Sequence, residues 1–262
     1  MSYTSLELNV ADQVATIWLN RPDAGNGIDL QLATELKSVA FDLETRADVR
    51  VVLLRGRGRN FSVGGDIKTF AEAGDAIARQ IKDIISNFHD AMLSLRRSAK
   101  PSIAVVHGAC AGGAMSLALG CDFIVADAAA TFAVAYRRLG ATADGGMTHT
   151  LTRVLGQRRA LELMLVSDRI TAAEALRLGL INRVAAADDL ERDVAALADT
   201  LRGNSPIATA AVKALVYDSP TASFERQLSA ELGAFARCAA SADFQEGLQA
   251  FLGRRPPNFE GR

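Results

Sequence analysis

The chain has 262 residues, of which 49% are hydrophobic and 23% are charged, and 29 Lys and Arg residues against 30 Asp and Glu residues give a net charge of −1. This composition is typical of a soluble globular protein with one large domain or two small ones. Because the charge is nearly balanced and the basic residues are scattered, the sequence does not favour binding to a nucleic-acid backbone or to an anionic membrane surface.

The cysteines and the apolar segments give no sign of export or of a membrane span. Three cysteines form no CxxC pair and leave one unmatched, which fits a reducing compartment better than a disulfide framework or a structural zinc site. No basic segment followed by an apolar stretch marks a secretory signal after Met1. The most apolar run, Gly108 to Cys121, is shorter than the roughly 20 residues of a membrane span. We therefore expect a cytoplasmic protein in which this run is buried.

The first half of the chain alternates between predicted strands and helices. Apolar residues alternate on both sides of a turn at 11–13, which is typical of a β-hairpin. Asp29 is expected to cap one helix, and Pro101 ends another just before a strand. In chain order the predicted elements are strands over 6–10 and 14–18, a helix over 29–44, a strand over 49–54, a helix over 75–97, and strands over 102–106 and 122–126. This order indicates an α/β fold.

The second half is predicted to be helical from residue 157 onward. Thr171 and Glu174 form a capping box, and Gly179 marks the end of that helix. The segment 204–206, Asn-Ser-Pro, is the best candidate for a boundary between an α/β part and a helical tail. The sequence thus predicts one unit over 1–203 and another over 204–262, with helices over 189–202, 207–217, 223–238 and 243–252.

Several common catalytic motifs are missing from the sequence. Gly56-Arg57-Gly58 follows a predicted strand, but a dinucleotide-binding fingerprint needs a third glycine where Phe61 stands. The sequence also has no GxxxxGK[ST] loop, no GxSxG elbow and no HExxH helix. Nucleotide hydrolysis, serine-hydrolase chemistry and zinc-dependent hydrolysis are therefore all disfavoured.

Two glycine pairs remain, and each directly follows a predicted strand. They lie in Ser62-Val63-Gly64-Gly65-Asp66 and in Gly108-Ala109-Cys110-Ala111-Gly112-Gly113. Without a Cβ, such residues can bring two backbone N–H groups onto one substrate oxygen, as an oxyanion hole requires. The residues alone favour a plainer interpretation, in which one pair is a turn and the other a close contact between a helix and a strand.

Several motifs in order resemble the enoyl-CoA hydratase/isomerase (crotonase) superfamily. They are Leu19-Asn20-Arg21-Pro22, Phe61 to Lys68, Lys100-Pro101 with Gly108 to Gly113, Cys121-Asp122, Leu165 to Gly179, and in the tail Phe244 to Gly247, Ala250-Phe251 and Arg254 to Pro256. The resemblance covers nearly the whole chain. It implies a ββα spiral core over 1–203, a helical trimerisation region over 204–262, an acyl-CoA thioester substrate, and a homotrimer or a hexamer made of two trimers.

The resemblance also implies roles for individual residues. Gly65 and Gly113 would donate the two oxyanion hydrogen bonds. The substrate and its CoA part would lie along Ala24, Ser62, Gly65, Asp66, Ile67, Gly112, Gly113, Ser116, Tyr136 and Leu139, with Arg254 reaching a CoA phosphate. Lys68 would lie toward the adenine end of CoA or simply be solvated.

The sequence departs from the hydratases of this superfamily at both of their catalytic glutamates. The two matching positions hold Ser116 and Tyr136. Adding water to a double bond calls for a paired acid and base, and neither side chain replaces a carboxylate well at its usual pKa. We therefore expect slow hydration, with Ser116 as a small helix residue under a close contact and Tyr136 as a wall of the pocket.

One carboxylate, Asp144, follows further on in Ala143-Asp144-Gly145-Gly146. From its position alone, Asp144 is favoured as the N-cap of a helix over about 147–155. The sequence resembles phenylacetate-pathway isomerases here, in which an Asp-Gly pair at this point supplies the acid/base group. It also resembles 4-chlorobenzoyl-CoA dehalogenases, in which an Asp here is the nucleophile and a histidine at the position of His89 is the base. A half-buried packing role for His89 is the more common one for a histidine at the margin of a helix stripe, His107 is expected to be structural, and His149 is unassigned.

The function predicted from these residues is an acyl-CoA isomerase in which Asp144 moves the proton and Gly65 and Gly113 hold the thioenolate. No metal site and no cofactor beyond the CoA of the substrate is expected. An enoyl-CoA hydratase, an aryl-CoA hydrolytic dehalogenase and a non-catalytic acyl-CoA binder are the competing hypotheses.

Overall fold

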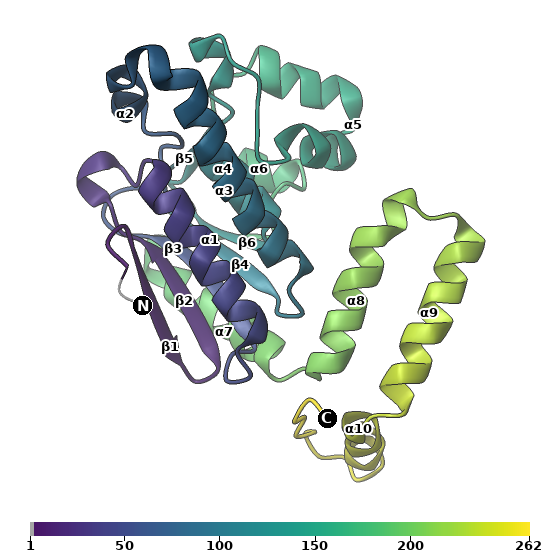
Figure 1. Ribbon diagram of the computed structural model, residues 1–262. Coiled ribbons are helices and arrows are strands. Elements are labelled where there is room, and N and C mark those ends of the chain that lie inside the picture. The colour runs from purple at the N-terminus through teal and green to yellow at the C-terminus, as the bar shows by residue number, and fades with distance from the viewer. Residues whose placement is uncertain (1–2) are drawn as a thin grey trace.

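The computed structural model describes residues 3–262, and within them it contains a six-stranded sheet, a three-stranded sheet and ten α-helices. Figure 1 shows a mixed α/β body with three C-terminal helices standing beside it. No helix among these residues is both long and apolar enough to cross a membrane.

The chain opens with the predicted hairpin. Strand β1 (Leu6–Ala11) pairs antiparallel with β2 (Val14–Leu19), and the turn residues Asp12 and Gln13 both have positive φ angles, 49° and 65°. Two such residues give the turn a twist that matches the twist of the flanking strands. Every second residue of β2 is buried, as the alternating pattern predicts.

The large sheet has the strand order β1-β2-β3-β4-β6-β9, and from β2 to β9 each strand is parallel to the next one in this order. Its remaining strands are β3 (Val51–Gly56), β4 (Ser102–Val106), β6 (Phe123–Asp127) and β9 (Arg183–Ala185). Each of the three longer ones reads as an almost continuous apolar run because helices cover both faces of the sheet.

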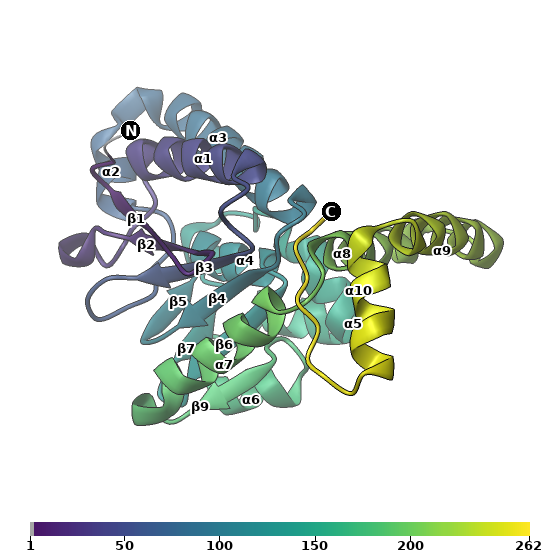
Figure 2. The same ribbon diagram turned by 90° about the horizontal axis from the view of Figure 1, so that it is seen from below.

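The two faces of this sheet carry separate apolar clusters. Val52 and Leu54 of β3 pack in the larger cluster, together with α1 (Leu30–Thr45) and α3 (Ile77–Arg97). Val51 and Leu53 point the other way and pack against α7 (Leu190–Arg202). Figure 2 shows α1 and α3 on one side of the strands and α7 on the other.

The helix starts follow the predicted capping signals. The Asp29 side chain accepts a hydrogen bond from Leu32 N at the start of α1, and Thr171 accepts one from Glu174 N at the start of α6 (Ala172–Arg177). The remaining helices are α2 (Ile67–Glu72), α4 (Gly113–Gly120), α5 (Met147–Leu165), α6 (Ala172–Arg177), α8 (Pro206–Asp218), α9 (Phe224–Ala239) and α10 (Ala242–Leu252).

The prediction of an all-helical chain after residue 157 is wrong in two places. Strand β8 (Ile170–Thr171) joins β5 (Ala109–Ala111) and β7 (Thr131–Ala133) in the small sheet, and β9 closes the edge of the large sheet. These strands have only two or three residues, which is too short for an alternating pattern to form in the sequence.

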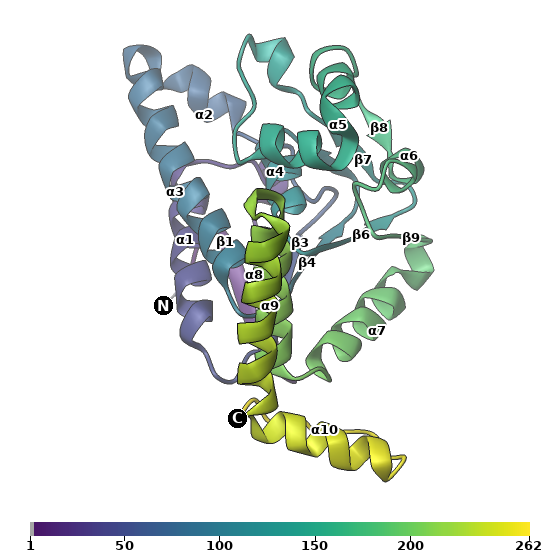
Figure 3. The same cartoon turned by 90° about the vertical axis from the view of Figure 1, so that its right-hand side faces the viewer.

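The C-terminal helices contact the body at a few points. The buried Lys213 of α8 forms an ion pair with Asp122, with Nζ 2.8 Å from Oδ2, and Tyr217 donates to Oδ1 of the same carboxylate at 2.6 Å. Figure 1 shows α8 and α9 side by side, and Figure 3 shows α10 extending beyond them. The chain leaves α7 at Arg202, where the predicted boundary lies, but the division into two domains stays a prediction.

The last residues turn back toward the body. Arg50 Nη2 donates to the carbonyl of Phe259 at 2.7 Å, and Arg50 Nη1 donates to the carbonyl of Arg202. The buried carboxylate of Asp243 accepts hydrogen bonds from Ser205 Oγ and from the N–H groups of Glu260 and Gly261. The tail thereby joins α10 to the segment that precedes α8.

Candidate active site

The two glycine pairs lie next to each other because the loops that carry them are hydrogen-bonded together. Ser62 pairs with Cys110 in an isolated parallel bridge, with Ser62 N donating to Ala109 O and Ala111 N donating to Ser62 O, both at 3.1 Å. The bridge continues the parallel order of the strands from which both loops emerge.

The glycine positions leave two backbone N–H groups free to bind a ligand. Gly65 and Gly113 both line the same pocket, and neither N–H donates to an acceptor within residues 3–262. Gly113 is the first residue of α4, so its N–H lies at the positive end of the helix dipole. Gly64 needs its φ of 91°, and a Cβ on it would lie only 2.5 Å from the carbonyl oxygen of Ala111. This arrangement has the form of an oxyanion hole.

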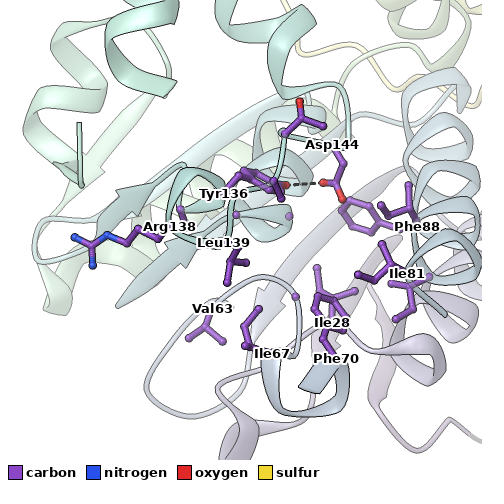
Figure 4. A pocket seen from close by; sticks show the side chains of 18 of the residues that line it. Ile28, Val63, Ile67, Phe70, Ile81, Phe88, Tyr136, Arg138, Leu139 and Asp144 are labelled. Carbon is purple, nitrogen blue, oxygen red and sulfur yellow. Dashed lines mark hydrogen bonds between the residues drawn. The ribbon is translucent and has the colours of Figure 1, made fainter. Parts of the chain in front are cut away.

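The pocket has a volume of about 570 Å³ and is largely apolar. One wall is a stripe of α3, and the opposite wall is formed by the segment 135–144 and by Val63 and Ile67, as Figure 4 shows in part. The side chains from α2 and α3 are Ile67, Phe70, Ala71, Ile77, Ile81, Ile84, Ile85 and Phe88. Arg138 points away at the rim and pairs with Asp168 at 2.9 Å.

Asp144 lies in this pocket and is the only carboxylate among the described residues that line it. Helix α5 begins at Met147, and its N-cap is Gly146, with no side-chain cap hydrogen bond. The N-cap role considered for Asp144 is therefore wrong. Its carboxylate accepts a hydrogen bond from Tyr136 instead, at 2.5 Å between the hydroxyl oxygen and Oδ1 (Figure 4).

Tyr136 is more than the pocket wall that the sequence predicts. Burial, together with the nearby charge of Asp144 and the hydrogen bond to it, raises the pKa of the Tyr136 phenol above its usual value near 10. The hydroxyl therefore stays protonated at neutral pH and acts as a donor. Tyr136 begins a 3-10 turn after Ala135, whose φ is 66°, and no sequence pattern reveals the direction that this turn gives to the ring.

Ser116 lies behind the pocket rather than in its wall. Its buried Oγ donates to the backbone carbonyl of Asp144 at 2.9 Å and lies 3.4 Å from the Tyr136 hydroxyl. A Cβ on Gly145 would come within 2.6 Å of Ser116 Cβ, which is the close contact that the sequence predicts for a small residue here.

The histidines have structural hydrogen bonds or lie outside the pocket. His89 Nε2 accepts a hydrogen bond from Gly145 N at 3.0 Å, and His107 Nε2 contacts the carbonyl of Gly58 at 2.9 Å. The bond to Gly145 uses the Nε2 lone pair that a base would need. His149 is exposed on α5, and burial with the charges of Arg153 and Arg96 lowers its pKa. Within residues 3–262 no group of three or more His, Cys, Asp or Glu is arranged to hold a metal ion.

Comparison with known proteins identifies the family. The model for the enoyl-CoA hydratase/isomerase family matches residues 9–262. The chain belongs to this family. A trans-2-decenoyl-[acyl-carrier-protein] isomerase from Streptococcus mutans is 30% identical over 100% of both chains. A crotonyl-CoA hydratase from Syntrophomonas wolfei is 30% identical over 99% of both chains.

Solved structures agree with this assignment. The chain matches an enoyl-CoA hydratase from Bacillus anthracis with a TM-score of 0.94 and 30% identity, over 99% of this chain and 100% of the other. A Polaromonas enoyl-CoA hydratase gives a TM-score of 0.92 and 31% identity, over 97% of this chain and 99% of the other. The predicted α/β crotonase fold is thereby confirmed.

The residues that the family resemblance singles out divide into two groups. One group lines the pocket: Gly65, Ile67, Gly112, Gly113, Tyr136, Leu139 and Asp144. The others, Ala24, Ser62, Asp66, Ser116 and Arg254, do not.

The second group has contacts of its own in the fold. Ser62 Oγ donates to Asn26 O and accepts from Gly64 N, while Asp66 pairs with Arg21 at 2.9 Å. Arg254 follows α10, outside this chain's pocket. The CoA contacts of these residues stay a prediction.

Proposed function

We propose that this chain is an acyl-CoA isomerase that moves a double bond by a proton shift. The observation that carries the proposal is one carboxylate, Asp144, in an apolar pocket with two unoccupied N–H donors at Gly65 and Gly113. A single carboxylate is sufficient for this reaction because the same group removes the proton and returns it.

In the proposed reaction Asp144 takes a proton from the carbon between the thioester and the double bond of a 3-enoyl-CoA. The electron pair of that C–H bond moves toward the carbonyl oxygen, which accepts hydrogen bonds from Gly65 N and Gly113 N. Asp144 then returns the proton to C4, and the product is a 2-enoyl-CoA. The shift consumes neither water nor an oxidant, and the apolar walls strengthen the charge interactions in the pocket.

Hydration of a 2-enoyl-CoA is the second candidate, and the names of several relatives support it. Against it stands the chemistry of Ser116 and Tyr136 at the two glutamate positions. The raised pKa of Tyr136 keeps its hydroxyl protonated, so the phenol is not a base for water at neutral pH.

Hydrolytic dehalogenation and silent binding of acyl-CoA have less support. Dehalogenation needs a base to activate water, and the bond from Gly145 N occupies Nε2 of His89. A silent acyl-CoA binder would have no use for a carboxylate placed beside two free N–H donors. Direct measurement of proton exchange distinguishes a binder from an enzyme.

The setting of the proposed enzyme follows from the same observations. We expect a homotrimer or a pair of trimers in the cytoplasm, where the three free cysteines stay reduced. The expected substrate is an acyl-CoA thioester, with Arg254 reaching a CoA phosphate. The proton shift needs no metal or redox cofactor.

The Asp144→Asn variant tests the proposal. It should lose about 10²- to 10⁴-fold in isomerisation of trans-3-hexenoyl-CoA and in deuterium uptake from D₂O, because an amide neither accepts nor returns the proton. Binding of hexanoyl-CoA and the melting temperature should change little. Full exchange in a well-folded variant would contradict the proposal. Wild-type hydration of crotonyl-CoA that outpaces isomerisation would favour the hydratase.

A further inference from the structure

The segment that carries Asp144 has little secondary structure of its own. Residues 140–146 connect a 3-10 turn to α5, and Gly140, Gly145 and Gly146 all have positive φ angles between 58° and 73°. Glycine adopts positive φ angles without strain, but it also has access to many other backbone conformations, so a segment rich in glycine is flexible. A proton-transfer group on such a segment needs outside support to keep its position.

Three side chains from three separate elements supply that support at three neighbouring groups. Ser116 of α4 donates to the carbonyl of Asp144, and His89 of α3 accepts from the N–H of Gly145. Tyr136, from the 3-10 turn, donates to the carboxylate itself. Both polar groups of the peptide unit that joins Asp144 to Gly145 are thus hydrogen-bonded, and the Asp144 side chain is held by a separate hydrogen bond.

The hydrogen bond from Tyr136 makes the two carboxylate oxygens different. Oδ1 accepts the Tyr136 hydroxyl at 2.5 Å, while Oδ2 has no protein donor within residues 3–262. The pair lies beside the oxyanion donor, because a Cβ on Gly113 would be 3.9 Å from both Oδ1 and the Tyr136 oxygen. Oδ2 is therefore the oxygen that is free to take a proton from a bound substrate.

We propose that Tyr136 is a positioning residue, whose hydroxyl holds Oδ1 of Asp144 so that Oδ2 removes and returns the substrate proton. The proposal rests on the isomerase function proposed for Asp144. Tyr136 keeps its own proton throughout: Oδ2 gains the proton as the C–H bond breaks, and loses it as the new C–H bond forms. Its contribution is the fixed orientation of the carboxylate.

The experiment compares Tyr136→Phe with Tyr217→Phe as a matched control. Both variants lose a hydroxyl that donates to an aspartate, at 2.5 Å and 2.6 Å, but Tyr217 bonds to Asp122, outside the pocket. For each variant and the wild type, kcat and KM for trans-3-hexenoyl-CoA are measured. Deuterium uptake at the α-carbon of hexanoyl-CoA and the melting temperature are recorded in parallel.

We expect Tyr136→Phe to lower kcat and α-exchange by about 10- to 100-fold, the loss that a small displacement of a reacting group produces. KM should stay nearly constant, because the phenyl ring still forms the pocket wall. Tyr217→Phe should retain wild-type rates. Ser116→Ala, which loosens the same segment without touching the carboxylate, should show a smaller loss of kcat and serves as a second variant if Tyr136→Phe does not fold.

The remaining outcomes separate this proposal from the proposed function. A change in KM alone would make Tyr136 a substrate contact, and unchanged rates or an equal loss in Tyr217→Phe would overturn the positioning role. If wild type exchanges α-protons without isomerising, the isomerase assignment fails, and the exchange rates still test Tyr136. If it does neither, both proposals are rejected.

Discussion

Gly64 and Gly113 are glycines for different physical reasons. At Gly64 the positive φ and the nearby carbonyl of Ala111 leave no room for a side chain. At Gly113 the backbone is helical, and the nearest atom to an added Cβ would be Ile28 Cδ1 at 3.5 Å, an ordinary contact. Gly64 therefore serves the fold, whereas a methyl group at Gly113 would mainly occupy space beside the Asp144 carboxylate.

This difference predicts that Gly113→Ala folds normally and loses activity. The methyl group would stand 3.9 Å from Asp144 Oδ1, beside the N–H to which the proposed function assigns the thioester oxygen. We expect kcat to fall by about 10²-fold or more, similar to the loss of one oxyanion donor. Isomerisation kinetics and thermal melts check this. Gly64→Ala is the control and should lower the melting temperature. A fully active Gly113→Ala enzyme would contradict the prediction that a methyl group here blocks access to the N–H.

The sequence predicts which residues line the site better than it predicts the hydrogen bonds between their side chains. The glycine pairs and Asp144 are recognisable because motifs preserve their order along the chain. The bond between Tyr136 and Asp144 depends on the left-handed backbone at Ala135, and the N-cap hypothesis fails because Gly146, with a φ of 73°, is the N-cap of α5. Side-chain directions set by such turns leave no periodic signal in a sequence.

Helix α8 is fixed to the body by one buried charged network. Lys213 and Asp122 have side chains that are only 8% and 10% exposed, and Lys213 also donates to the carbonyls of Leu95 and Lys100. The guanidinium of Arg96 lies 3.8 Å above the ring of Tyr217. These contacts join α8 to the end of α3 and to the start of β6.

Removing Lys213 should therefore weaken the protein strongly. Lys213→Ala leaves a buried carboxylate without its cation, and we expect a loss of about 3 to 5 kcal/mol in the free energy of unfolding. Lys37→Ala is a suitable control, because Lys37 pairs with Asp90 at 2.7 Å on a more exposed surface, and such pairs contribute about 1 kcal/mol or less. Urea unfolding of both variants measures the difference. Equal losses would contradict the anchoring role of Lys213.

Elements with many periods are predicted well, and short ones are not. α3 repeats its apolar stripe over 21 residues, and the tail helices end within two residues of their predicted limits. The expected helix over 147–155 and the helical pattern from residue 157 meet at Gly156, where α5 has a non-helical φ of 74°. The strands β5, β7, β8 and β9 form only because neighbouring strands offer hydrogen bonds.

The whole molecule presents much apolar surface on its C-terminal helices. Leu232 of α9 is 74% exposed and Phe251 of α10 is 82% exposed, and Phe224, Phe235 and Leu252 are also more than half exposed. Apolar surface gathered in this way is typical of a subunit interface. The expected trimer would cover it.

We predict a trimer or a hexamer by light scattering, with residues 223–252 at or near the contacts. Leu232→Asp should shift the protein toward monomers, because it places a charge in an apolar interface. Ser229→Asp, at an exposed polar position of the same helix, should not. A wild-type protein that is monomeric at micromolar concentration would show that these faces are not an interface of identical copies.

The hydrogen bonds that attach the C-terminal tail should be lost at acid pH, because they depend on the ionised carboxylate of Asp243. Burial alone would raise the pKa of this carboxyl, but hydrogen bonds from Ser205, Glu260 and Gly261 outweigh it and lower the pKa below 3.8. Stability from a lowered pKa is complete above the unfolded value and is lost as pH falls through the folded value. The unfolding free energy should therefore depend less on pH between about 5 and 2 in Asp243→Asn than in wild type. Parallel pH profiles would contradict this.

The return of the tail to Arg50 also fixes an order of events during synthesis. The residue that donates, Arg50, precedes its acceptor, Phe259, by 209 positions in the sequence. Domains generally fold from the N-terminus as the chain grows, so the sheet with its two layers of helices can assemble while the tail is still being made. The hydrogen bonds that residues 259–261 make to Arg50 and to Asp243 of α10 form only after these residues have been synthesised. A chain shortened to end before Phe259 should therefore keep the assembled pocket but lack these bonds between α10, the tail and the body.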